Sequence, residues 1–281
     1  MSLIARLLSH PALHAVLGCG LFLFLYGATG GAATAWPPLR GTPGQLLVTL
    51  AGAAAGIAGY GWFERVVERR REAAFALPGA GRELAGGLLL GAGLFSLAVA
   101  LVALLGGLAI EGVRGIGELW GMAAMAVASG VYEELVFRGI LFRQIERWLG
   151  SGVALALTAA FFGTAHLLNP DATWFAALAI AFEAGILLGA AYMLTRRLWL
   201  AVGIHAAWNF TQGWVFSVPV SGGRAPAGLL QVTRHGPDWL TGGAFGLEAS
   251  AVAMVVATGA GIAMLALARR RGAFMPPAWR R

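Results

Sequence analysis

Residues 84–110 read LAGGLLLGAGLFSLAVALVALLGGLAI, which is 27 residues without one charged side chain. A helix needs about 20 apolar residues to cross a ~30 Å hydrocarbon core, so this stretch is long enough to span a membrane. Comparable apolar stretches occur on both sides of it, along the whole chain. The predicted spans are 13–35, 44–63, 84–110, 119–148, 152–168, 172–194, 198–216 and 245–268. The sequence therefore predicts an all-α, polytopic transmembrane helix bundle of about eight spans.

The composition supports a chain that has lipid as its solvent. Of 281 residues, 58% are hydrophobic and 12% are charged, and the mean hydropathy is +0.74. Soluble domains carry about 25% charged residues and could not stay dissolved with so little polar surface. Loops with proline, glycine or charge separate the spans, but no fixed-period repeat and no boundary of a second domain is visible. We expect one integral membrane domain over 1–281.

All twenty basic residues are arginine, which is typical of a GC-rich genome and suggests a bacterial inner membrane protein. The formal charge of +7 is not arranged as a basic stripe with interleaved aromatic residues, so we expect no nucleic-acid partner. If the N-terminus is cytoplasmic, sixteen arginines fall in inside segments and four in outside segments. Because cytoplasmic loops are enriched in arginine, both termini are predicted to be cytoplasmic. Cys19 is the only cysteine, which excludes an intrachain disulfide.

Ionisable residues inside a bilayer are costly and mark functional sites, and here they form three clusters. Glu133, Glu134 and Arg138 come first; the i,i+4 spacing lets Glu134 pair with Arg138, while Glu133 points about 100° away. His166 near the end of the fifth span is the second cluster. His205 and Asn209 share one face of the seventh span and form the third. Their depths match only if the fourth helix continues to about residue 148.

Several protease chemistries lack the residues that they need. The sequence has no HExxH helix, and its two aspartates, Asp171 and Asp238, are in loops. Ser129 is a weak candidate nucleophile, because serine is a common packing residue in membrane helices. A glutamate, two histidines and an asparagine remain, and they could activate water and stabilise an oxyanion. Two histidines and a glutamate could equally hold a divalent metal such as zinc.

The motifs EExxxR (133–138), FxxxH (162–166) and HxxxN (205–209) resemble the CAAX prenyl protease and bacteriocin-processing (CPBP, or Abi) family. The resemblance covers 120–216, the predicted catalytic core. It implies that Glu133 and His166 activate water and that His205 and Asn209 stabilise the oxyanion. Glu134 and Arg138 would be structural support.

The sequence is compatible with alternatives for the metal, for Glu183 and for the function. The family has been described as metal-dependent, with Glu133, His166 and His205 as possible ligands here, and as glutamate-dependent without metal. The resemblance gives no role to Glu183, which is predicted at mid-depth in the sixth span. The predicted function is an intramembrane peptidase that acts on a peptide or membrane protein. The alternative is a non-enzymatic membrane protein, such as an immunity factor or a small-solute transporter.

Overall fold

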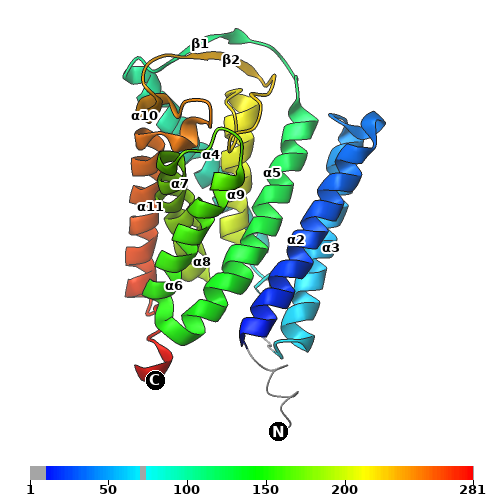
Figure 1. Cartoon of the computed structure of the whole chain (residues 1–281), viewed down its shortest axis with the longest axis vertical. Coiled ribbons are helices and arrows are strands. Elements are labelled where there is room, and N and C mark those ends of the chain that lie inside the picture. Colours follow the sequence, from blue (N-terminus) through cyan, green and yellow to red (C-terminus); the bar gives the residue numbers. More distant parts are fainter. Residues whose placement is uncertain (1–10, 70–73, 281) are drawn as a thin grey trace.

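A computed structural model describes residues 11–69 and 74–280, most of which form helices that run along one axis (Figure 1). The long elements are α2 (Pro11–Ala35), α3 (Pro43–Val66), α4 (Ala80–Leu104), α5 (Leu119–Glu134), α6 (Arg143–Ala165), α7 (Trp174–Ile180), α8 (Ile186–Thr195), α9 (Trp199–Phe210) and α11 (Ala251–Arg270). π-Helical segments η2 (Leu135–Phe142), η4 (Ala181–Gly185) and η5 (Thr211–Val215) join or extend them. The short elements are η1 (Pro37–Leu39), β1 (Leu108–Val113), η3 (His166–Leu168), β2 (Leu230–Arg234), α10 (Asp238–Thr241), η6 (Leu247–Ala249) and η7 (Ala278–Arg280).

In the described part of the chain, five helical segments are long and apolar enough to cross a membrane: Pro43–Val66, Ala80–Leu104, Leu119–Leu168, Trp174–Thr195 and Ala251–Arg270. They confirm a polytopic helical membrane protein. The count of about eight spans is not confirmed by this number and stays a prediction. Part of the difference is that Leu119–Leu168 is 50 residues long and holds both the fourth and the fifth predicted spans.

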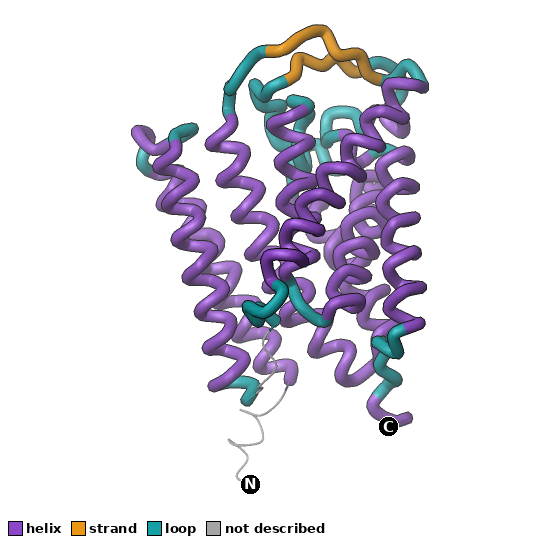
Figure 2. Tube along the Cα trace, turned by 180° about the vertical axis from the view of Figure 1, so that it is seen from behind, coloured by secondary structure: helices purple, strands orange, loops and turns teal. Residues whose placement is uncertain are grey.

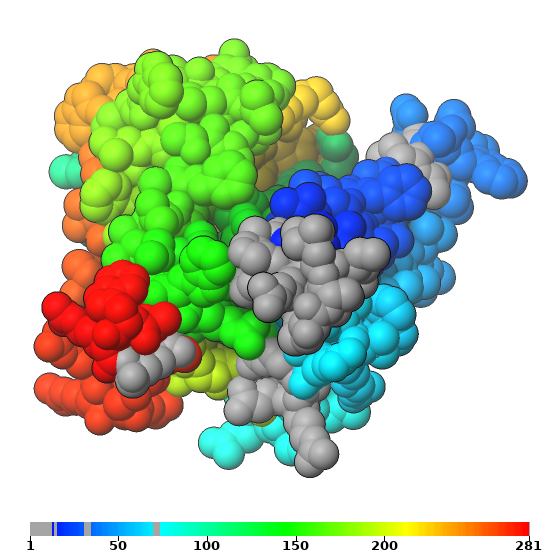
Figure 3. Space-filling model, turned by 60° about the horizontal axis from the view of Figure 1, so that its bottom comes forward, coloured from blue at the N-terminus to red at the C-terminus, as the bar shows by residue number. Residues whose placement is uncertain are grey.

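The chain reverses within α6 at Gly150, whose backbone is not helical (φ 77°, ψ 169°). A side chain there would be strained by the positive φ, and its Cβ would lie 2.9 Å from the Met275 carbonyl oxygen. The Ser151 N–H donates to that same oxygen at 3.0 Å. The C-terminal segment thus packs against the turn at this end of the bundle (Figure 3).

A two-stranded sheet adds to the helices, so the purely all-α prediction was incomplete. β1 pairs antiparallel with β2, and the ribbon lies across one end of the bundle (Figure 2). α4 ends at Leu104 instead of continuing to residue 110. Gly106 follows with φ 76°, which ends the helix and turns the chain into β1.

Glycines bring α9 close to the two helices beside it. Gly87 and Gly91 of α4 face α9, and a Cβ on Gly91 would lie 2.3 Å from the Ile204 carbonyl oxygen. A Cβ on Gly203 of α9 would lie 2.6 Å from the Leu84 oxygen. On α5, Gly130 faces the backbone of Ala206. Small residues permit this close packing in membranes, and they fix the helix that carries His205.

The start of α2 and the end of α11 lie at the same end of the bundle (Figure 1). The Gly150 turn is at this end, and so is the connection from α8 to α9, because Arg196 donates to Ala273 and binds Glu146. Arg6, Arg70, Arg71 and Arg281, which contribute to the predicted orientation, lie outside the described residues.

Candidate active site

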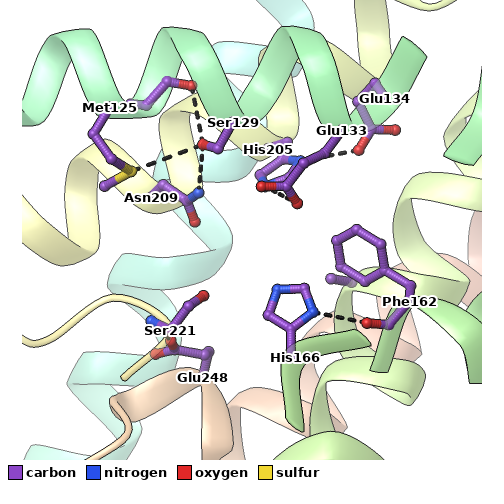
Figure 4. A network of polar contacts seen from close by, with 12 residues as sticks. Met125, Ser129, Glu133, Glu134, Phe162, His166, His205, Asn209, Ser221 and Glu248 are labelled. Carbon is purple, nitrogen blue, oxygen red and sulfur yellow. Dashed lines mark hydrogen bonds and ion pairs between the residues drawn. The ribbon is translucent and has the colours of Figure 1, made fainter. Parts of the chain in front are cut away.

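Three separate segments bring the predicted catalytic residues to one cavity of about 660 Å³. Glu133 comes from the end of α5, His166 from the junction of α6 and η3, and His205 and Asn209 from α9. α5 continues through η2 into α6, so the long fourth helix that their convergence required is present. Figure 4 shows these side chains around a common space.

The ion pair predicted between Glu134 and Arg138 is confirmed. Arg138 Nη1 lies 2.8 Å from Glu134 Oε1, and both side chains are almost completely buried. Arg138 Nη2 also donates to the Ala184 carbonyl oxygen at 2.9 Å, and the guanidinium lies 4.6 Å from the centre of the Phe162 ring. Arg138 therefore ties η2 to η4 and to α6, which is a structural role.

Glu134 has a second partner that the sequence did not predict. Its Oε1 lies 2.9 Å from Nδ1 of His205. An ionised carboxylate only accepts hydrogen bonds, so Nδ1 carries the hydrogen and the ring is held in a fixed orientation. The other ring nitrogen, Nε2, lies 3.9 Å from Glu133 Oε2. Glu134 thus supports both the arginine and the histidine.

The two adjacent glutamates lie in different environments, as their angular separation on a helix predicted. The Glu134 side chain is fully buried, whereas the Glu133 side chain is 24% exposed and lines the large cavity. The helix widens into η2 directly after Glu134. Such π-helical turns occur often at functional sites, and nothing in the local sequence predicted this one. Of the pair, Glu133 is the carboxylate that a water molecule can reach.

His166 is held by its own helix. Nδ1 lies 2.7 Å from the Phe162 carbonyl oxygen, four residues earlier. Because a carbonyl can only accept, Nδ1 carries the hydrogen, and Nε2 of the neutral ring is left as an acceptor. The Phe162 ring is near both imidazoles. Its centroid lies 4.8 Å from the centroid of the His166 ring and 6.2 Å from that of the His205 ring. His166 is therefore arranged to accept a proton at Nε2.

Asn209 is oriented by Ser129, the residue that was a weak candidate nucleophile. Asn209 Nδ2 donates to Ser129 Oγ at 2.9 Å, and the hydroxyl donates to the Ala126 carbonyl oxygen at 3.4 Å. No hydrogen bond joins Ser129 to a histidine among the described residues. This arrangement suits a positioning residue, since a nucleophilic serine needs an adjacent base.

The sequence reasoning missed Glu248 and Ser221, which face His166 across the site (Figure 4). Glu248 was absorbed into the predicted span 245–268, but α11 begins only at Ala251. Its Oε1 accepts the Ser221 N–H at 2.5 Å. A lone glutamate inside an apolar stretch was the signal that could have identified it.

The edge of the cavity carries an exposed ion pair. Arg224 Nη2 lies 2.8 and 2.9 Å from the two carboxylate oxygens of Glu118, and Arg224 lines the cavity. Partial burial acts to raise the pKa of Glu118, but the Ala227 N–H and the guanidinium of Arg224 outweigh it, so the pKa is lowered.

The possible metal ligands do not meet as a set. No group of three or more histidine, cysteine, aspartate or glutamate side chains in 11–69 and 74–280 is arranged to hold a metal ion. Nδ1 of His205 is hydrogen-bonded to Glu134, and Nε2 lies near Glu133. His166 does not join these two residues as a third ligand. The arrangement of these donors therefore does not fit a zinc site.

Comparison with known proteins gives one match. Residues 115–211 match a family model described as Type II CAAX prenyl endopeptidase Rce1-like. Neither the curated proteins nor the solved structures give a match. The matched segment includes Glu133, Glu134, Arg138, His166, His205 and Asn209. This match confirms the resemblance seen in the motifs: residues 115–211 are similar to the Rce1-like type II CAAX prenyl endopeptidases.

Proposed function

We propose that the chain is an intramembrane endopeptidase that hydrolyses a peptide bond in a peptide or membrane-protein substrate. The core at 120–216 would carry the chemistry. One observation carries the proposal: Glu133, His166, His205 and Asn209 line the same cavity although they come from separate segments. The Rce1-like match supports a protease.

In the first step, Glu133 and Nε2 of His166 bind and polarise a water molecule. Both groups can accept a proton, and Glu133 is the carboxylate that faces the cavity. The water loses a proton to one of them as its oxygen attacks the peptide carbonyl carbon. General base assistance of this kind typically contributes about 10²–10⁴-fold.

His205 and Asn209 then stabilise the negative oxygen of the tetrahedral intermediate. Asn209 Nδ2 has two hydrogens, and Ser129 accepts only one of them. His205 can donate from Nε2 if its ring is positively charged. The carboxylates of Glu133 and Glu134 carry two negative charges, and the guanidinium of Arg138 carries one positive charge. The local charge is therefore minus one, and a positively charged His205 would balance it.

The intermediate collapses when the carbon–nitrogen bond breaks. The leaving amine takes one proton from Glu133 or His166, and the proton lost by the attacking water makes up for it. The proton count on the protein is then unchanged, and the products are a carboxylic acid and an amine, which become a carboxylate and an ammonium group when a proton passes between them. The buried Glu134 and Arg138 take no part in the transfer but keep His205 and η4 in place.

We also propose that the chain crosses a bacterial inner membrane eight times, with both termini in the cytoplasm. The Gly150 turn supports two spans within Leu119–Leu168. α9 with η5 is an apolar helix that starts at Trp199 and ends at Val215, and α2 is a further apolar helix. Single cysteines introduced in a Cys19→Ser background would test this topology, since a periplasmic C-terminus would contradict it.

The activity can be tested with the full-length protein in liposomes and a library of quenched-fluorescent peptides, with cleavage sites read by mass spectrometry. Wild-type protein should cleave a subset, and Glu133→Gln protein of equal thermal stability should not. Elemental analysis of the same samples addresses the metal. Stoichiometric zinc that is lost in both His166→Ala and His205→Ala would replace the metal-free mechanism with a metal-dependent one.

A further inference from the structure

A second, much smaller cavity adjoins the candidate active site. It measures about 30 Å³ and is bordered on one side by His166, His205 and Asn209. On the other side it is bordered by Glu183 of η4 and Glu248 of η6. A water molecule needs about 10–15 Å³ by this measure, so the cavity has room for about two. Most of its lining is apolar, but these five side chains supply the polar partners that a buried water molecule needs.

Glu183 contributes a carboxylate that lacks a partner. The side chain is 2% exposed, and its Oε2 atom has no hydrogen bond to any described residue. The backbone directly after it is held in place, because Arg138 donates to the next residue, Ala184, and Gly185 packs on Ala159 with no room for a Cβ. An unpartnered buried carboxylate is costly, so a water molecule or a bound proton must satisfy it.

Glu248 differs from Glu183 because it is hydrogen-bonded. It accepts the Ser221 N–H and the side-chain amide of Gln212 while being only 3% exposed. Two buried carboxylates that line one small cavity disfavour each other's ionised form, and a close pair of this kind can hold one proton between its members. Glu248 is stabilised as the anion by its donors, so Glu183 is the better site for that proton.

Other charged groups face this pair from the surrounding elements. They are His166 of η3, His205 of α9, Glu133 of α5 across the large cavity, Arg138 of η2 behind η4, and Arg234 of β2, which interacts electrostatically with Glu248. The hydrogen on His166 Nδ1 is engaged by Phe162, so Nε2 is the ring atom available for exchange.

We propose that Glu183 and Glu248 share one proton and exchange it with His166 through water in the small cavity. Glu133 takes the proton of the attacking water, while a proton passes from the carboxylic acid through the cavity water to Nε2, which gives it to the leaving amine. The proton on Glu133 then passes to Nε2 and refills the pair along the same path. No other reactant is consumed. The pair would act as a proton reservoir that does not touch the substrate. This inference rests on the proposed function, because the reservoir serves the histidine that handles the proton of the leaving amine.

The alternative is that both glutamates only hold the bundle together. The isosteric changes Glu183→Gln and Glu248→Gln preserve shape, so a structural role predicts altered stability but the wild-type dependence of turnover on pH. The reservoir instead predicts an altered pH dependence and an altered solvent deuterium isotope effect on kcat. Thr258→Val, which removes another buried polar atom without a hydrogen bond, is the matched control on α11.

Infrared difference spectroscopy of the purified full-length protein tests the shared proton without any substrate. Titration in H₂O and D₂O should show a protonated carboxyl band that is lost in Glu183→Gln, shifted in Glu248→Gln and unchanged in Thr258→Val. Peptide turnover should fall about tenfold or more in the Glu183 variant, with a changed pH profile. If neither Gln variant alters the band, or if both keep the wild-type pH profile, the proposal is wrong.

Failure of the proposed function would look different. The carboxyl band would then still depend on Glu183 and Glu248, but Glu133→Gln would cleave peptides as well as the wild type does. That result would overturn the assignment of Glu133 and the relay that serves it, while the shared proton itself would stand.

Discussion

Two buried arginines on the same continuous helix each pair with a glutamate, but the two pairs have different surroundings. Arg138 binds Glu134 next to the large cavity, and Arg143 binds Glu68 one and a half turns further along. Glu68 also accepts a hydrogen bond from Gln144, and Arg143 donates to the Gly139 carbonyl oxygen. At the first pair the extra partner of the glutamate is His205, whose second nitrogen faces Glu133.

The comparison shows that a buried ion pair does not by itself identify a functional site. Both pairs would be singled out by the cost of placing charge in a membrane. Only the pair at Glu134 is connected to a group that can exchange a proton with something in a cavity. At the other pair, the further partner of Glu68 is the side-chain amide of Gln144, and that of Arg143 is the Gly139 carbonyl oxygen. We therefore expect mutations at the two pairs to affect stability alike and catalysis differently.

The largest expected effect is at Glu133, the carboxylate next to the first pair that faces the cavity. Glu133→Gln keeps the size of the side chain but removes the base, so peptide turnover should fall by about 10⁴-fold. The melting temperature should stay close to that of the wild type. Glu111→Gln on β1 is the control for a glutamate outside the site, and it should keep full activity. An unfolded Glu133→Gln protein, or one with near-normal turnover, would contradict the assignment.

The second prediction sets the two pairs against each other. Arg138→Ala and Arg143→Ala each leave a buried carboxylate uncompensated, so each should lower the free energy of unfolding by about 3–5 kcal/mol. Turnover per folded molecule should fall in Arg138→Ala, because Glu134 no longer holds His205 in place, and should be unchanged in Arg143→Ala. Chemical denaturation and active-site-normalised kinetics measure the two effects. Equal losses of turnover in both variants would remove the distinction between the pairs.

Much of this arrangement could be predicted from sequence because its signals are local. Apolar length predicted the helical membrane bundle, and i,i+4 spacing predicted that Glu134 pairs with Arg138 and that Glu133 faces elsewhere. The rise of a helix predicted that the site forms only if the fourth helix is long, and this helix is present.

Features that depend on contacts between distant segments could not be predicted in this way. The bond from Glu134 to His205 joins residues 71 positions apart. The β1–β2 ribbon forms because two segments far apart in sequence pair at one end of the bundle, and the first of them overlaps the end of a predicted span. The approach of Glu248 to Glu183 depends on the irregular backbone before α11, where a continuous helix had been predicted.

The third prediction separates Asn209 from the serine that orients it. Asn209→Ala removes one donor to the oxyanion, which typically costs about 10²–10³ in kcat. KM should change little, because this hydrogen bond strengthens mainly in the transition state. Ser129→Ala should cost less, because the carboxamide keeps its donors and only its orientation is loosened. A larger loss in Ser129→Ala than in Asn209→Ala would indicate that the serine itself takes part in the chemistry.

The smallest effect is expected at an ion pair outside the buried region, Glu118 with Arg224. Both side chains are substantially exposed, at 37% and 74%. Exposed pairs typically contribute about 0.2–1 kcal/mol, so Arg224→Ala should destabilise the protein far less than Arg138→Ala does. Added salt should remove most of the difference from the wild type.

The dependence on pH gives a further check on this exposed pair. The pKa of Glu118 is lowered in the folded protein from the ordinary value of 4.5. The stabilisation is therefore present above pH 4.5 and is lost as the pH falls through the lowered pKa of the folded state. Denaturation of wild-type and Arg224→Ala proteins should differ at neutral pH and converge in acid. If the difference persists in acid or in high salt, Arg224 stabilises the edge of the cavity through packing of its side chain instead of through its charge.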